Sequence, residues 1–75
     1  MDIDTDKIDD AVLALLCLTL HDGFRAWKSF DWNALNRLHE KGLIEDPVNK
    51  ARSVLLTPAG VEEAERLFKK LFCRS

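Results

Sequence analysis

Apolar residues recur at helical spacing in three stretches of the chain, and the first of them is residues 4–23. Five aspartates crowd the first ten residues, where they complement the positive end of a helix, and Thr5 or Asp6 is the expected N-cap. Between Ala11 and Leu20 only Thr19 is polar. A helix that is apolar on nearly all sides has to be covered on most of them. The pattern therefore predicts a first helix that a second copy of the chain helps to cover.

The second helical stretch follows Phe30. Asp31 is the expected N-cap, and Gly42 is the expected left-handed residue beyond the last turn, with Leu43 folding back on Leu38. A helical wheel gives this helix two sides. The apolar side holds Trp32, Ala34, Leu35, Leu38 and His39, and the polar side holds Asn33, Asn36, Arg37, Glu40 and Lys41.

Short apolar runs flank a polar turn between the second and third helices. Residues 43–44 and 53–56 predict the two strands of a β-hairpin, broken at Asp46-Pro47. Thr57 and Pro58 then supply an N-cap and a first-turn proline for the last helix. Its apolar stripe consists of Val61, Ala64, Leu67, Phe68, Leu71 and Phe72.

The connector "FRAWKSF" between the first two helices is too short for a standard helix, and we expect it to be irregular or strand-like. Together the elements predict one α+β domain over residues 1–75: helix, short connector or strand, helix, β-hairpin, helix. An acidic N-terminal cap (1–6) and a short C-terminal tail (73–75) flank it.

The segments "LNRLHEKGLI" and "LLTPAG" carry a resemblance to a known pattern. Over about residues 30–72 the chain resembles the second half of a winged helix-turn-helix domain of the MarR and PadR type. The matching positions are Leu35, Leu38, Gly42, Leu43, Ile44, Leu56, Thr57 and Gly60. The whole chain is also similar to a small bacterial family of unknown function that shares the "FDW" and "EKGLI" segments.

The resemblance implies a winged-helix-like fold in which residues 32–41 form the recognition helix. A transcription-regulator-like module that binds double-stranded DNA is then the first functional hypothesis. A helix-turn-helix also needs a supporting helix before the recognition helix. Only eight residues, from Gly23 to Phe30, are available for it. We expect that helix to be reduced to about one turn or absent.

On the DNA hypothesis, the polar side of the second helix reads base edges and nearby cations contact phosphates. The base-reading candidates are Asn33, Asn36 and Arg37, and the phosphate-binding candidates are Lys41, Lys50, Arg52, Arg25 and Lys28. The formal net charge is −2, although Lys and Arg outnumber Asp and Glu by ten to eight from residue 11 onward. Such a balance is weaker than that of dedicated nucleic-acid binders. An ordinary solvated helix face explains the same residues.

The alternative hypothesis is a protein-interaction or homodimerisation module that binds no nucleic acid. Tryptophan is well suited to binding hot spots, and the first helix is rich in leucine. The expected interface residues are Leu13, Leu16, Leu20 and Trp27.

The chain offers little for catalysis or cofactor binding, so we expect no enzyme activity, no cofactor, no small-molecule ligand and no metal. "DIDTD" imitates a calcium loop, but Lys7 stands where glycine is required. Cys17 and His21 lack two further zinc ligands, with only His39 as an obvious addition. No membrane span or signal peptide is evident. The two cysteines lack the spacing of a disulfide framework, which favours the cytoplasm.

Overall fold

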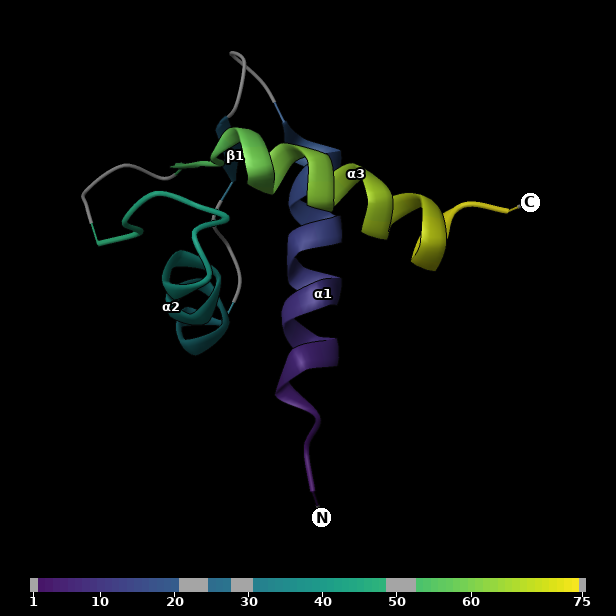
Figure 1. The fold of residues 1–75 in the computed structure, drawn as a ribbon, viewed down its shortest axis with the longest axis horizontal. Coiled ribbons are helices and arrows are strands. Elements are labelled where there is room, and N and C mark those ends of the chain that lie inside the picture. Colours follow the sequence, from purple (N-terminus) through teal and green to yellow (C-terminus); the bar gives the residue numbers. More distant parts are fainter. Residues whose placement is uncertain (1, 21–24, 28–30, 49–52, 75) are drawn as a thin grey trace.

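Helix α1 is the central element of the structure, a computed structural model that describes residues 2–20, 25–27, 31–48 and 53–74, with only the backbone of Trp27 included. The elements are α1 (Thr5–Leu16), the 3-10 turn η1 (Cys17–Thr19), β1 (Arg25–Trp27), α2 (Trp32–Glu40), β2 (Ser53–Leu55) and α3 (Pro58–Phe72). Helix α2 packs on one side of α1, and α3 crosses α1 at a steep angle (Figure 1). The fold is α+β.

The helix N-termini follow from local chemistry. The Asp31 carboxylate accepts a hydrogen bond from the Ala34 N–H at 3.2 Å, and the Thr57 hydroxyl accepts one from the Gly60 N–H at 3.0 Å, so both predicted caps are confirmed. The cap of α1 is Asp4, which accepts from the Lys7 N–H at 3.2 Å. The prediction of Thr5 or Asp6 was wrong, because several aspartates in a row offer equivalent caps.

The end of α2 is the predicted glycine-terminated turn. Gly42 has a φ of 76°, in the left-handed region. The Leu43 N–H donates to the Leu38 carbonyl at 3.0 Å, and the Gly42 N–H donates to the His39 carbonyl at 2.9 Å. These two bonds define a Schellman motif. They turn the chain back toward α1 and place Ile44 in the core.

Strand β2 pairs with β1, in antiparallel register, with Ala26 opposite Val54. The predicted connector strand is thus confirmed, while the predicted hairpin between residues 43–44 and 53–56 is shorter than expected. Ile44 meets Leu56 only as an isolated antiparallel bridge, supported by a 2.8 Å hydrogen bond from the Glu45 N–H to the Leu55 carbonyl. The reason is the proline at position 47, which has no N–H to extend that pairing.

The core is formed by thirteen apolar residues from all three helices, both strands and the segments beside them. They are Val12, Leu13, Ala14, Leu16, Ala26, Ala34, Leu35, Leu38, Ile44, Val54, Leu56, Ala64 and Leu67. Trp32, expected on the apolar side of α2, is 47% exposed instead. It is the first residue of α2.

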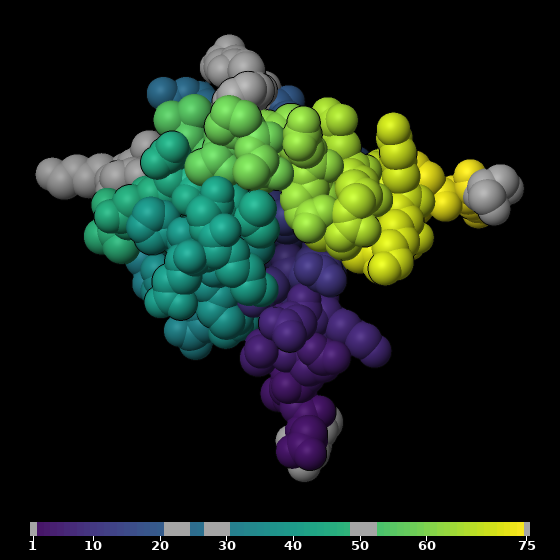
Figure 2. Space-filling model, in the orientation of Figure 1, coloured from purple at the N-terminus to yellow at the C-terminus, as the bar shows by residue number. Residues whose placement is uncertain are grey.

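The apolar stripe of α3 extends beyond the buried part of the helix. Ala64 and Leu67 are buried, whereas Leu71 and Phe72 in the last turn are 45% and 47% exposed. In the space-filling view, the C-terminal end of α3 and the N-terminal end of α1 project from the body in different directions (Figure 2). Among the described residues, no helix has the length and apolar character needed to cross a membrane.

Candidate functional site

Asp9 of α1 is buried and binds two cations of the α2 region. Its side chain has no exposed surface. The Arg37 Nε donates to both carboxylate oxygens, at 3.0 and 2.8 Å, and the Arg37 Nη2 donates to Oδ1 at 2.8 Å. The Lys41 ammonium donates to Oδ2 at 3.1 Å. We call Asp9, Arg37 and Lys41 the Asp9 cluster.

The electrostatics of the Asp9 cluster favour the ionised pair. Hydrogen bonding from Arg37 lowers the pKa of Asp9, against the opposing effect of burial, and Lys41 lowers it further. The hydrogen bond to Asp9 likewise raises the pKa of Arg37. Asp6, at the exposed edge, approaches the Lys41 ammonium at 3.7 Å. A buried carboxylate that is satisfied by bidentate arginine and by lysine is a tie between α1 and α2.

The Asp9 cluster changes how the proposed DNA-binding face can work. The Arg37 guanidinium, expected to read base edges, is bound to Asp9, and 31% of its side chain is exposed. Lys41, expected at a phosphate, donates to the same carboxylate. Asn33 is exposed and Asn36 is half-buried on α2. The face therefore offers one exposed amide and two cations that are already partly neutralised.

Of the other predicted phosphate-binding residues, the structure describes only Arg25, which is not part of α2. Arg25 lies on β1, where its Nη1 donates to the Ser53 hydroxyl at 3.4 Å. Lys28, Lys50 and Arg52 lie outside the described residues.

The predicted protein-interface residues need a correction. Leu13 and Leu16 are 1% and 0% exposed, so α2 and α3 already cover them within one chain. A second copy of the chain cannot reach these side chains. Leu20 is half-buried against the core, and the side chain of Trp27 lies outside the described part of the chain.

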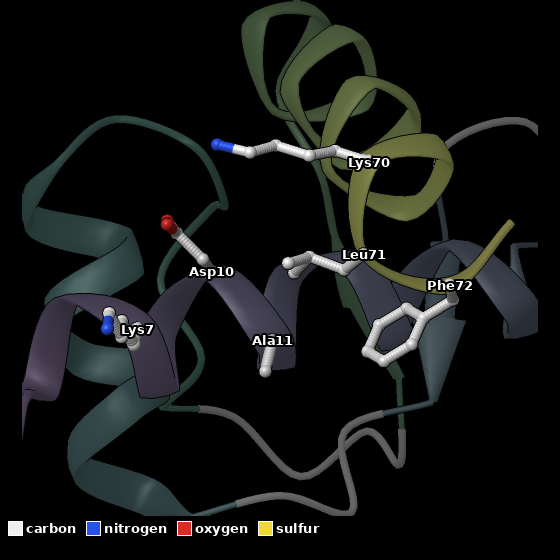
Figure 3. A pocket seen from close by; sticks show the side chains of 6 residues that line it. All are labelled: Lys7, Asp10, Ala11, Lys70, Leu71 and Phe72. Atoms are coloured by element: carbon white, nitrogen blue, oxygen red, sulfur yellow. The ribbon is translucent and has the colours of Figure 1, made fainter. Parts of the chain in front are cut away.

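An apolar groove lies in the angle between the N-terminal half of α1 and the last turn of α3. It measures about 440 Å³ and is lined by Lys7, Asp10, Ala11, Lys70, Leu71 and Phe72. Figure 3 shows the Leu71 and Phe72 side chains extending from the last turn of α3 toward the Ala11 side of α1. The Asp10 carboxylate and the Lys70 ammonium lie along one edge. The sequence gives no sign of this groove, because Leu71 and Phe72 continue a helical stripe that elsewhere is core.

Metal binding finds no support within the part of the chain that the structure describes. No three side chains of the His, Cys, Asp or Glu type come together there in a way that could hold an ion. Burial raises the pKa of the Cys17 thiol, which keeps it protonated. The His39 Nδ1 lies 3.1 Å from the Ile44 carbonyl, and His21 is outside the described residues.

The fold and these surfaces define a small α+β domain with an ion-paired helix contact and an open apolar groove. The chain belongs to a family known as a domain of unknown function, DUF6429, whose model matches residues 4–74. It is 62% identical, over 99% of its length and 100% of the relative's, to the uncharacterized protein y4hR of Sinorhizobium fredii. No solved structure matches the chain.

Proposed function

We propose that this bacterial domain is a winged-helix-like module that works through association of protein chains, with a homodimer as its basic unit. The observation that carries the proposal is the exposure of Leu71 and Phe72, 45% and 47%, at the end of an apolar stripe. Contiguous exposed apolar surface rimmed by charge is typical of protein–protein contacts. The free thiols of Cys17 and Cys73 agree with a cytoplasmic setting.

The winged-helix assignment is supported by the order of the elements. Gly42 follows the end of α2, the Ile44 segment bridges to Leu56, and Thr57 caps α3, as in the pattern that the sequence resembles. Strand β2 lies between β1 and the Ile44 segment. Only the four positions 28–31 separate β1 from α2, which are too few for a supporting helix. In the part of the chain that the structure describes, this arrangement has a wing-like sheet and no helix between β1 and α2.

DNA binding is the second candidate, and the exposed Asn33 on α2 is what favours it. Amide side chains suit adenine in the major groove. Against it stands the Asp9 cluster, because freeing Arg37 for a base means leaving the buried Asp9 carboxylate without its bidentate partner. We therefore rank chain association above DNA binding.

The two candidates are separated by two measurements on the same preparation. Analytical ultracentrifugation from low to high micromolar concentration is expected to show a monomer–dimer equilibrium. Fluorescence anisotropy with mixed-sequence duplexes at low and moderate salt is expected to show no salt-dependent binding. A monomer at every concentration contradicts the association proposal. Salt-dependent duplex binding that is lost in Asn33→Ala, but kept in the matched exposed variant Glu62→Ala, establishes the DNA alternative instead.

A further inference from the structure

One side of α1, and of the η1 turn that continues it, remains uncovered by α2 and α3. The residues at positions 8, 11, 15 and 18 share a helical face, since they are spaced by three or four. Ile8 and Leu18 on this face are 38% and 64% exposed, and the two positions between them are half-buried. Leu71 and Phe72 continue the surface across the groove. We call the surface formed by Ile8, Ala11, Leu15, Leu18, Leu71 and Phe72 the α1/α3 face.

We propose that the α1/α3 face is the contact surface for a second copy of this chain, arranged with two-fold symmetry. This inference rests on the proposed function and assigns its interface. In such a dimer the groove of each copy receives the last turn of the partner's α3. The contact is isologous, so the same patch has to be complementary to itself.

The charges around the α1/α3 face supply that complementarity. At the α1 end, Asp2 and Asp4 are exposed beside one exposed cation, Lys7, whereas the carboxylates of Asp6 and Asp9 are directed to Lys41. At the α3 end, residues 66–74 contain four cations and no anion. Lys69, Lys70 and Arg74 among them are exposed.

A two-fold axis through the apolar centre brings the acidic end of each copy against the basic end of the other. Opposite charges that flank an apolar centre orient association and exclude other registers. Apolar surface in the middle of the patch, with charge at its two ends, is the arrangement that a symmetric dimer needs.

Substitutions in the α1/α3 face test the contact directly. Leu71→Asp and Leu18→Asp each place a charge on an exposed position from a different element, so the fold of the monomer should stand, which circular dichroism checks. We expect each to weaken dimerisation by about tenfold or more in sedimentation equilibrium. Val48→Asp is the matched control, because Val48 is 66% exposed and lies in a different part of the molecule. It should dimerise as the unmodified chain does.

Charge reversal tests the symmetry. In Arg74→Glu the α3 end loses positive charge, and in Asp2→Lys the α1 end loses negative charge, so each variant alone should dimerise more weakly at low salt. An equimolar mixture should form heterodimers more strongly than either variant forms homodimers, since both end contacts are then attractive. An intrachain role for Asp2 and Arg74 does not predict this gain on mixing.

These outcomes distinguish a failure of the proposed interface from a failure of the proposed function. A monomeric unmodified chain overturns both proposals. A dimer that Leu71→Asp and Leu18→Asp leave unchanged keeps the association proposal and overturns this interface. Weakening by both variants, with the Val48→Asp control unaffected and the mixture restored, establishes the α1/α3 face as the dimer contact.

Discussion

The Arg37 guanidinium and the Asp9 carboxylate join α2 to α1 through three hydrogen bonds of 2.8–3.0 Å. Their environments differ, because the Asp9 side chain has no exposed surface while 31% of the Arg37 side chain is exposed. Removing the arginine leaves a buried anion without its bidentate partner. Removing the carboxylate leaves a cation that is accessible to water. The two partners therefore contribute unequally to the cost of breaking the pair.

This inequality predicts that two variants lower the melting temperature by different amounts. Arg37→Met removes the bidentate donor and leaves Asp9 with Lys41 alone, so its melting temperature should fall by roughly 10 °C or more. Asp9→Asn keeps the shape and one acceptor oxygen, so its decrease should be about half as large. Thermal unfolding followed by circular dichroism measures both. Equal decreases, or a larger one for Asp9→Asn, would contradict the asymmetry.

The lowered pKa of Asp9 predicts acid sensitivity. Its ordinary pKa is 3.8, and the folded state holds it below that value, chiefly through Arg37. The unfolded chain therefore takes up a proton first as the pH falls. The stabilisation is complete above about pH 5 and is lost progressively as the pH drops below 3.8 toward the pKa of the folded state.

Urea unfolding at a series of pH values measures this loss. The unmodified chain should lose stability more steeply than Asp9→Asn between about pH 5 and pH 2. Glu63, whose pKa is lowered by its exposed pairing with Arg66, gives the matched control. Glu63→Gln should follow the unmodified chain closely, because exposed pairs contribute little. Parallel plots of stability against pH for Asp9→Asn and the unmodified chain would show that Asp9 is not the source of the acid sensitivity.

Local signals in the sequence predicted both ends of α2 and the start of α3. Asp31, Thr57 and Gly42 act through hydrogen bonds or backbone angles set within a few residues, so their roles can be deduced from neighbouring residues alone. The burial of Asp9 could also have been predicted from the sequence. It precedes Val12, Leu13 and Leu16 by three, four and seven positions, which places a carboxylate on the buried stripe of α1.

Long-range pairing could not be predicted from local signals in the sequence. The register of Ala26 with Val54 joins segments 28 residues apart, and nothing local distinguishes it from the nearer pairing expected at Ile44. The partner of Asp9 was hidden for the same reason, since Arg37 lies 28 residues away. The groove required knowing where α3 crosses α1, which decides that Leu71 is exposed while Leu67 is buried.

The two thiols should differ in reactivity. Burial raises the pKa of Cys17, and the negative charge of Glu65 adds to the effect, whereas Cys73 is exposed. Since the thiolate is the reactive form, Cys73 should be alkylated by iodoacetamide at pH 8 several-fold faster than Cys17. Peptide mass spectrometry over a time course measures both rates. In urea the rates should converge, and a Cys17 that reacts as fast as Cys73 in the folded chain would contradict its burial.

Two glycines should respond differently to alanine because they are needed for different reasons. A Cβ on Gly60 would lie 1.8 Å from the Leu43 carbonyl oxygen, a backbone atom that is held by a 3.0 Å hydrogen bond from the Thr57 N–H. Neither partner can move without separating α3 from the end of α2. A Cβ on Gly42 meets nothing within 4 Å, and its cost comes only from the φ of 76°.

Gly60→Ala should therefore lower the free energy of unfolding by about 3 kcal/mol or more, the upper range for overpacking. Gly42→Ala should lower it by about 1–2 kcal/mol, the penalty of a left-handed residue with a side chain. Urea denaturation of both variants at neutral pH gives the comparison. A smaller loss for Gly60→Ala than for Gly42→Ala would mean that α3 does not approach Leu43 as closely as the structure has it. Because α3 carries one side of the α1/α3 face, Gly60→Ala should also weaken dimerisation, while Gly42→Ala should leave it unchanged in molecules that remain folded.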